Sequence, residues 1–260
     1  MPKRSRLWER AETLAAFNLY CKMPSNKISK HNEEIITLAK QLNRTPRAIE
    51  MKMRNLQWHD PDNKDGLWHS SKLDKNIWKE FSDDPEKIIY ESEEARVCFD
   101  SKTMEENTVV EHKMKISELE EMKIPELEER QRVIRVRVNQ GFFRRSVLSS
   151  YDEKCCITGL AVVELLNASH IIPWREKRSR LDPRNGLCLN VLHDRAFDRG
   201  LMTILPDGEI VISKYLRKQA NKCDESAFIA DYEGKTMYMP DKFRPKKEFL
   251  EYHNKKIYKR

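Results

Sequence analysis

The chain has 260 residues, a length that suits one large domain or two small ones. Charged residues make up 35% and apolar residues 39%, and no window approaches the roughly 20 apolar residues that cross a bilayer, so no membrane partner is expected. Its seven glycines stand singly, which excludes a glycine-rich phosphate loop and a dinucleotide fingerprint and argues against a nucleotide cofactor.

The net charge of +7 is unevenly distributed. Residues 1–55 carry 12 basic and 5 acidic side chains, residues 98–130 carry 5 and 10, and residues 131–260 carry 26 and 16. Two basic blocks beside an acidic one predict two polyanion-facing domains and a solvated linker, although ordinary solvated surfaces would give the same charges. Because no apolar segment follows the basic start, we expect a cytoplasmic protein with reduced cysteines.

Residues 1–97 predict a helical domain. Apolar residues recur at helical spacing from Leu7 to Tyr20 and again over 32–42, where Asn32 is suited to cap a helix. Thr45 and the proline after it then open a third helix, which is basic. Helix, short turn and basic helix form a helix-turn-helix outline.

Two further helices, over 72–81 and 84–96, complete this domain in the prediction. The segment RTPRAIEMKMRNL, with its flanks, resembles a Myb/SANT or helix-turn-helix arrangement, which implies a DNA-recognition domain. A three-helix module that binds another protein would show the same pattern. The side chains expected to contact DNA are basic and surround the third helix: Arg44, Arg47, Lys52 and Arg54.

Residues 98–130 are polar, charged and poor in aromatic residues, and Pro125 would break a long helix there. We interpret them as a charged linker. A contribution of this segment to dimerisation is the alternative.

The last part, residues 131–260, predicts a small mixed domain. RVIRVRV alternates as a strand does, and ELLNASHII predicts a second strand that ends at His170. A polar loop and the short strand GLCL follow, after which Asn190 can cap a helix that Gly200 ends. We expect Leu192 to face the core and the helix to bring His193 towards His170.

In this order, His170, Asn185-Gly186, His193 and Phe197-Asp198 resemble the motifs of the HNH (ββα-metal) endonuclease family. The resemblance covers about residues 131–215. It implies an α+β protein, in which an all-α helix-turn-helix-like domain and a linker precede a ββα-metal nuclease domain.

The family implies the role of each residue. His170 would be the general base, Asn185 would hold the loop that orients it, and His193 would bind a divalent metal, Mg²⁺ or Mn²⁺. Many relatives have a metal ligand directly before the base, where this chain has Ser169. The candidates for the second ligand are Asp198, water held by Ser169, and His170 itself.

Some relatives stabilise the fold with a zinc ion held by two CxxC pairs. The corresponding positions here are taken as Cys155 with Thr158 and Leu189 with Leu192. Three of these four cannot bind zinc, so we expect no structural zinc.

Basic and polar side chains near the predicted site favour phosphate binding and double-stranded DNA as partner. They are Gln140, Arg144, Arg175, Arg178 and Arg180.

Together these features predict a metal-dependent DNA endonuclease, with a restriction enzyme as the first interpretation. Dependence on modified cytosine is a further expectation from the two-part architecture. The alternatives are a homing, phage or toxin-type HNH nuclease, and a DNA-binding regulator with an inactive HNH domain. One site per chain favours a homodimer for double-strand cuts.

Overall fold

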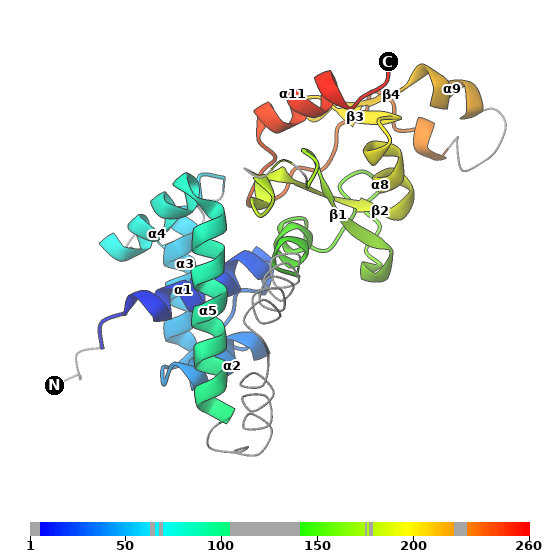
Figure 1. Ribbon diagram of the computed structural model, residues 1–260. Coiled ribbons are helices and arrows are strands. Elements are labelled where there is room, and N and C mark those ends of the chain that lie inside the picture. The colour runs from blue at the N-terminus through cyan, green and yellow to red at the C-terminus, as the bar shows by residue number, and fades with distance from the viewer. Residues whose placement is uncertain are drawn as a thin grey trace, which may run out of the picture. The chain divides into compact units, whose positions relative to one another are not determined.

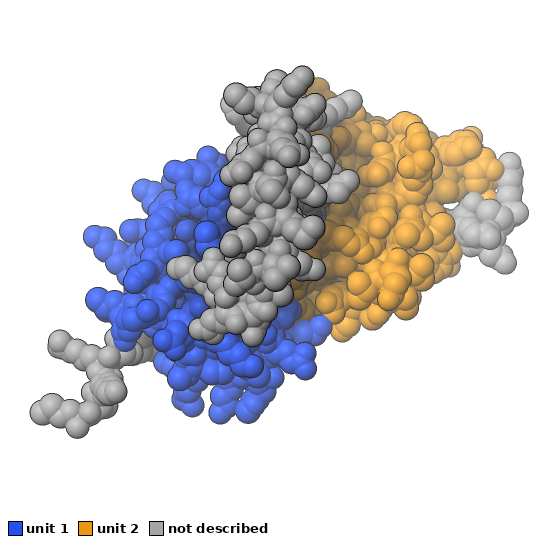
Figure 2. Space-filling view, turned by 60° about the horizontal axis from the view of Figure 1, so that its bottom comes forward, with its two compact units in different colours: residues 1–21, 26–142 blue, residues 22–25, 143–260 orange. Residues whose placement is uncertain are grey.

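The computed structural model describes residues 6–62, 66–67, 70–104, 141–174, 176, 179–220 and 228–260 (Figure 1). The chain divides into two compact units, coloured separately in Figure 2. Unit 1 comprises residues 1–21 and 26–142, and unit 2 comprises residues 22–25 and 143–260. The expected mixture of helices and strands is confirmed, with an all-helical first part and small sheets in the second.

Unit 1 is built from helices whose starts the sequence marks clearly. Asn32 caps one helix by accepting a hydrogen bond from the backbone N–H of Glu34, and Thr45 caps the next by accepting from that of Ala48, as predicted. The helices are α1 (Arg10–Lys22), α2 (Glu33–Gln41), α3 (Pro46–Trp58), α4 (Lys72–Asp83) and α5 (Pro85–Met104).

The limits of two helices differ from the prediction. α1 begins at Arg10 rather than Leu7, and Leu7 is 87% exposed. α5 continues past the predicted domain end at residue 97 to Met104. Composition changes at residue 98, but the backbone continues in the same helix because no proline or glycine interrupts it there.

α1 forms the centre of unit 1, because each of its residues from Glu12 to Cys21 is buried. The Phe17 ring makes edge contacts with Trp78 and Phe81 of α4, at centroid distances of 5.4 and 5.3 Å. Ile77, Trp78, Phe81, Ile88 and Ile89 of α4 and α5 are all buried as well. A helix buried on every side has no polar stripe, which is why its sequence is weakly amphipathic.

Unit 2 contains the expected order of strand, strand and helix. β1 and β2 pair antiparallel, with Leu166 opposite Asn190 and His170 opposite Gly186 (Figure 1). Its elements are a helix over 141–150, β1 (Leu166–His170), β2 (Gly186–Asn190), α8 (Val191–Asp198), β3 (Met202–Ile204), β4 (Ile210–Ile212), α9 (Lys214–Ala220) and α11 (Lys247–Lys256).

The caps of α8 follow the prediction, but one core residue does not. Asn190 accepts hydrogen bonds from the backbone N–H groups of Leu192 and His193, and Gly200 stops the helix with a φ of 68°. Leu192 is 43% exposed, so its predicted place in the core is wrong. The buried side of α8 is instead formed by His193, Ala196 and Phe197.

Gly186 explains how the helix over 141–150 reaches the sheet. A Cβ atom at this position would lie 2.2 Å from Cγ2 of Val147 and 3.0 Å from Cζ of Phe143. Only glycine therefore permits this close packing. This packing also positions the Phe143 ring, which stacks on the imidazole of His170.

Several predictions lie outside the described residues, namely the strand RVIRVRV and most of the linker. Among the residues described, no helix is long and apolar enough to cross a membrane.

Candidate active site

His170 lies at the end of β1, as predicted, between two aromatic rings. The Phe143 ring stacks on its imidazole with a centroid distance of 3.8 Å and an interplanar angle of 9°. The Trp174 ring meets it edge-on at 5.4 Å. These two contacts fix the plane of the imidazole.

One hydrogen bond fixes which nitrogen of His170 carries the proton. Nε2 lies 3.0 Å from the backbone carbonyl oxygen of Arg180. A carbonyl oxygen can only accept, so in the neutral ring Nε2 carries the hydrogen and Nδ1 keeps its lone pair. Burial lowers the pKa of His170, while the Arg180 carbonyl opposes this shift. The ring is therefore neutral at physiological pH, with Nδ1 available to accept a proton.

Asn185 is fully buried and holds the loop that follows β1. Its Oδ1 accepts a hydrogen bond from the backbone N–H of Ile172 at 2.8 Å. Its Nδ2 donates to the carbonyl oxygens of Ile172 and Ser179 at 3.0 and 3.1 Å. Because this loop also contains Arg180, Asn185 places the carbonyl that orients His170.

Asp194, which the sequence analysis did not select, faces β1 from α8. The Asn167 amide donates to its Oδ2 at 2.7 Å, and the Ser169 hydroxyl donates to its Oδ1. Ser169 is 3% exposed and directly precedes His170. The Asp194 carboxylate is therefore bonded to the strand at the residue directly before the base candidate.

This strand–strand–helix unit coincides with a known family. Residues 155–205 match the family described as HNH endonuclease. The segment is an HNH endonuclease domain. The match confirms the resemblance found in the sequence and does not include residues 1–154 or 206–260. No curated protein matches the chain.

Within the HNH domain, His193 lies on the buried side of α8 together with Ala196 and Phe197. Its ring contacts Phe228 and Tyr232 edge-on at 5.3 and 5.4 Å, and its Nδ1 lies 3.1 Å from Oδ1 of Asn190.

Burial lowers the pKa of His193 to about 4, so the ring is neutral. Its Nε2 is buried and has no hydrogen-bond partner among the described residues. The metal-ligand role of His193 therefore stays a prediction.

Asn190 connects two of the positions compared with the zinc-binding cysteines of relatives to His193. Its Nδ2 lies 3.7 Å from Cys155 Sγ and 3.5 Å from Thr158 Oγ1, and its Oδ1 lies 3.1 Å from Nδ1 of His193.

Asp198 follows Asp194 by one helical turn of α8. Loss of water around its carboxyl group, followed by the nearby charge of Asp194, raises the pKa of Asp198. Two carboxylates that repel each other are a hard-oxygen donor pair suited to Mg²⁺ or Mn²⁺. The described residues contain no group of three or more His, Cys, Asp or Glu that could hold a metal ion.

The predicted phosphate-binding residues of the HNH domain are only partly described. Arg144 donates to the backbone carbonyl of Leu166 at 2.8 Å, and Arg180 donates to that of Trp174 at 2.7 Å. Both guanidinium groups thus support loops beside the site while remaining partly exposed. Gln140, Arg175 and Arg178 lie outside the described residues.

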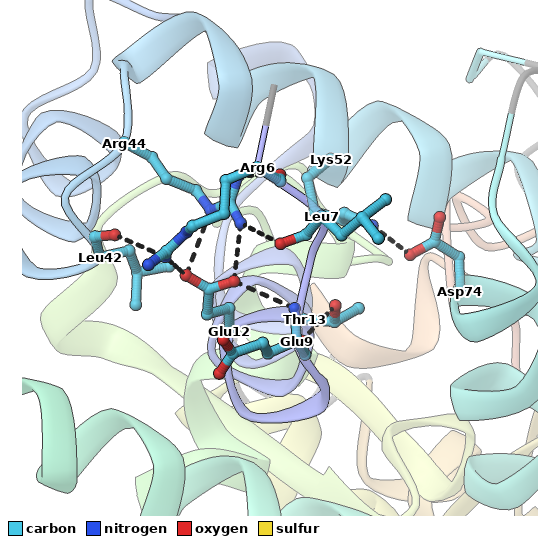
Figure 3. A network of polar contacts seen from close by, with 9 residues as sticks. All are labelled: Arg6, Leu7, Glu9, Glu12, Thr13, Leu42, Arg44, Lys52 and Asp74. Atoms are coloured by element: carbon cyan, nitrogen blue, oxygen red, sulfur yellow. Dashed lines mark hydrogen bonds and ion pairs between the residues drawn. The ribbon is translucent and has the colours of Figure 1, made fainter. Parts of the chain in front are cut away.

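In unit 1, two of the predicted DNA contacts are buried in ion pairs. Lys52 Nζ lies 2.7 Å from Asp74 Oδ1, and the two side chains are 3% and 0% exposed. Arg44 Nη2 lies 2.7 Å from Oε2 of the buried Glu12. Figure 3 shows both pairs, with Glu12 facing Arg44 and Arg6 together.

These pairs make Arg44 and Lys52 parts of the core. Burial alone would raise the pKa of Glu12, but its hydrogen bonds with Arg44 and with the Glu9 backbone lower it. The Arg44 guanidinium also lies 4.1 Å from the centre of the Trp8 ring. The prediction that Arg44 and Lys52 contact DNA is therefore wrong, since neither presents its charge to solvent.

Proposed function

We propose that the chain is a metal-dependent DNA endonuclease in which His170 is the general base. The observation that carries the proposal is the 3.0 Å contact from His170 Nε2 to the Arg180 carbonyl, while the preceding residue, Ser169, donates to the Asp194 carboxylate. It leaves Nδ1 as the proton acceptor of a neutral ring. A neutral, oriented imidazole is what water activation requires.

In the proposed reaction, His170 Nδ1 takes a proton from a water molecule, and the oxygen of that water attacks the phosphorus of a DNA phosphodiester. The bond from phosphorus to one ester oxygen breaks, and the departing oxygen is protonated from solvent. Asn185 keeps the Arg180 carbonyl against Nε2 throughout, so the ring does not turn when it becomes charged.

Asp194 and Asp198 are the residues that would hold the divalent cation. Each oxygen of Asp194 accepts one hydrogen bond and keeps further lone pairs, so Asn167 and Ser169 orient the carboxylate without saturating it. Ser169 thus becomes an orienting residue rather than a ligand. The cation supplies charge neutralisation at the phosphate and at the departing oxygen.

We assign the enzyme to restriction of double-stranded DNA in the cytoplasm, with unit 1 as recognition domain and two copies for cutting both strands. A basic chain with a nuclease domain and a separate helical unit supports this assignment. Dependence on modified cytosine belongs to the same proposal. A homing, phage or toxin-type nuclease would use the same chemistry for another purpose.

The first test is cleavage by the purified full chain with Mg²⁺ or Mn²⁺ on matched plasmids with and without 5-methylcytosine. Discrete fragments from only the methylated plasmid would support all parts of the proposal. Fragments from both would support the nuclease and overturn the dependence on modification. Intact DNA under both metals, together with DNA binding, would favour the regulator with an inactive domain.

Asp194→Asn tests the metal site. Loss of one carboxylate charge should raise the Mg²⁺ concentration for half-maximal cleavage by at least about tenfold, because affinity follows the ligand charge. Asp231→Asn, which changes an exposed aspartate of the same unit, should leave the titration unchanged. An unchanged titration in Asp194→Asn would remove Asp194 as a ligand.

A further inference from the structure

Unit 2 has an apolar patch at the end of the β1–β2 pair that is opposite to His170. Residues 161–165 are all exposed, and four of these five are apolar. A run of about three or more exposed apolar residues is seldom left on a soluble surface without a function. The start of α8 adds two more. We define the β1-start patch as Val162, Val163 and Leu165, which are 43%, 40% and 45% exposed, with Val191 and Leu192, which are 45% and 43% exposed.

The two parts of the patch are neighbours because of the strand register. Leu166 pairs with Asn190 at this end of the two strands. Leu165 and Val191 are the next residues beyond that pair, one on each chain segment. Asp194, about one helical turn after Val191, is hydrogen-bonded to β1 at 2.7 Å, which holds the start of α8 against the strand. The aliphatic side chains of both parts therefore belong to one surface.

The backbone under the patch is held in place by hydrogen bonds. Arg144, from the helix over 141–150, donates to the carbonyl oxygens of Leu166 and Val163 at 2.8 and 3.4 Å. Asn190 caps α8 by accepting from the backbone N–H of Leu192 at 3.1 Å. A surface that is ordered before it binds loses little conformational entropy on association.

The area of the patch suits one side of a dimer interface. Five aliphatic residues that are 40–45% exposed present on the order of 350 Å², within the roughly 300–600 Å² of the largest apolar patch on a typical monomer. A standard interface buries about 800 Å² on each partner, of which about 57%, or roughly 450 Å², is apolar. The patch thus supplies most of the apolar area that one copy contributes to a stable dimer.

The patch is bordered by one charge of each sign. Glu164 is exposed within η2 (Val163–Leu165), and Arg195 is exposed on α8, one turn after Val191. Neither makes a hydrogen bond or an ion pair with any residue that the structure describes. In a two-fold dimer every contact between two different residues occurs twice, once in each direction. Glu164 of each copy can then meet Arg195 of the other, so the patch is complementary to itself in charge as well as in apolar character.

We infer that the β1-start patch is the interface between two copies of this chain, related by a two-fold axis through the patch. His170 follows Leu165 by five residues, about 16 Å along an extended strand, so both base residues stay outside the interface. The use of this dimer rests on the proposed function, in which one site on each copy cuts one strand of DNA. The dimer itself is tested without DNA.

Sedimentation velocity of the full chain, at about 1 to 50 µM, tests the interface. The wild-type chain should form a dimer whose fraction rises with concentration. Val163→Asp and Leu192→Asp should each raise the dissociation constant of the dimer at least about tenfold, because a carboxylate would be buried without a partner. Aspartate is favourable in the first turn of a helix, so Leu192→Asp should keep α8 folded. Tyr215→Asp, at a 64% exposed residue in the first turn of α9, is the matched control and should dimerise as wild type.

A charge exchange tests the orientation of the two copies. Glu164→Arg and Arg195→Glu should each weaken the dimer about two- to fivefold. The double variant should recover the wild-type dissociation constant, because the same pair forms with its signs exchanged, and a loss of folding would not produce this recovery. A wild-type chain that stays monomeric at the highest concentration, or Val163→Asp and Leu192→Asp that dimerise as wild type, would overturn the inference. The patch would then suit a different protein partner.

Cleavage of a supercoiled plasmid separates failure of the interface from failure of the function. The wild-type dimer should produce linear DNA directly, whereas the monomeric Val163→Asp should accumulate nicked circles first. If the wild-type chain forms the dimer but cuts no DNA, the nuclease proposal falls and the interface stands. If the wild-type chain cuts DNA but remains monomeric, only the interface falls.

Discussion

The two units differ in the environment of the buried polar side chains that the sequence analysis selected for DNA binding or catalysis. In unit 1 they are charges of opposite sign placed against each other, Lys52 with Asp74 and Arg44 with Glu12. In unit 2 they are neutral groups such as Asn185 and His170, whose partners include backbone carbonyls. In a buried ion pair the two charges neutralise each other and serve to hold the fold. A neutral imidazole with one nitrogen hydrogen-bonded still has its other nitrogen available for proton transfer.

The difference shows how to separate structural from functional polar residues. Removing one member of an ion pair leaves an uncompensated charge inside the protein, so the cost falls on stability. Removing an imidazole that accepts a proton takes away a reaction step, so the cost falls on rate. The four predictions below run from the largest expected effect to the smallest.

His170→Ala should lower the cleavage rate about 10²- to 10⁴-fold, because general base catalysis is lost. The free energy of unfolding should fall by only about 1–2 kcal/mol, because the ring loses its stacking on Phe143 and one hydrogen bond to a carbonyl but leaves no buried charge behind. Plasmid cleavage and thermal unfolding of the same preparation measure both effects. His31→Ala, at an exposed histidine of unit 1, is the control. Cutting at near wild-type rate would refute the base assignment.

Lys52→Met should reduce the free energy of unfolding by about 3–5 kcal/mol, because Asp74 is left buried without its counter-charge. Cleavage per folded molecule should persist. Denaturant titration measures the loss, and the exposed Lys40→Met is the control. The double variant with Asp74→Asn should recover much of it, since asparagine can still accept the hydrogen bond from the Ser71 backbone. Wild-type stability with weakened DNA affinity would instead restore Lys52 as a DNA contact.

The sequence predicts the elements well where local chemistry decides them. Asn32, Thr45 and Asn190 cap helices because their side chains can accept backbone hydrogen bonds, which depends on neighbouring residues only. The place of His170 at a strand end and the match of residues 155–205 to HNH endonucleases follow from motif order.

What the sequence could not supply is the direction of side chains whose partners are distant in the chain. Lys52 pairs with Asp74 on another helix, and neither segment of the sequence indicates this partner. The sequence analysis therefore treated the buried Lys52 as a surface residue. The contacts of Asp194 with Asn167 and Ser169 were not predicted either, because they join α8 to a strand 25 to 27 residues earlier in the chain. One signal was available: residues 193, 196 and 197 share a side of the helix, so 194 and 198 face another direction.

Acid should weaken unit 2 through His253. Burial lowers the pKa of His253 from its ordinary 6.5 to about 4, although its hydrogen bond to the Phe197 carbonyl opposes the shift. The unfolded chain binds this proton first, so the stabilisation is complete above pH 6.5 and is lost as the pH falls towards 4.

The expected loss is on the order of 3 kcal/mol across that range. Denaturant titrations at several pH values measure it. His253→Phe cannot take up the proton and should remove about half of the dependence, because the buried His193, whose pKa is also lowered to about 4, still takes up its own proton. His31→Ala should leave the dependence unchanged. An equally steep loss in His253→Phe would assign the acid sensitivity to other groups.

Phe143→Leu should give the smallest and most specific effect. Removing the stacked ring frees His170 to turn and exposes it to water, so its pKa should rise towards the ordinary value. A base must be neutral to act, and the acid limb of the cleavage rate should therefore move to higher pH, with a few-fold loss at the optimum.

Phe197→Leu is the matched control, because Phe197 stacks in the same way on His253, at 3.7 Å and 10°. Both variants should lose a similar amount of stability, about 1 kcal/mol, since each removes part of a buried ring. Only Phe143→Leu should shift the acid limb. A shift of equal size in both would mean that the limb reports loosening of unit 2 as a whole and not the surroundings of His170.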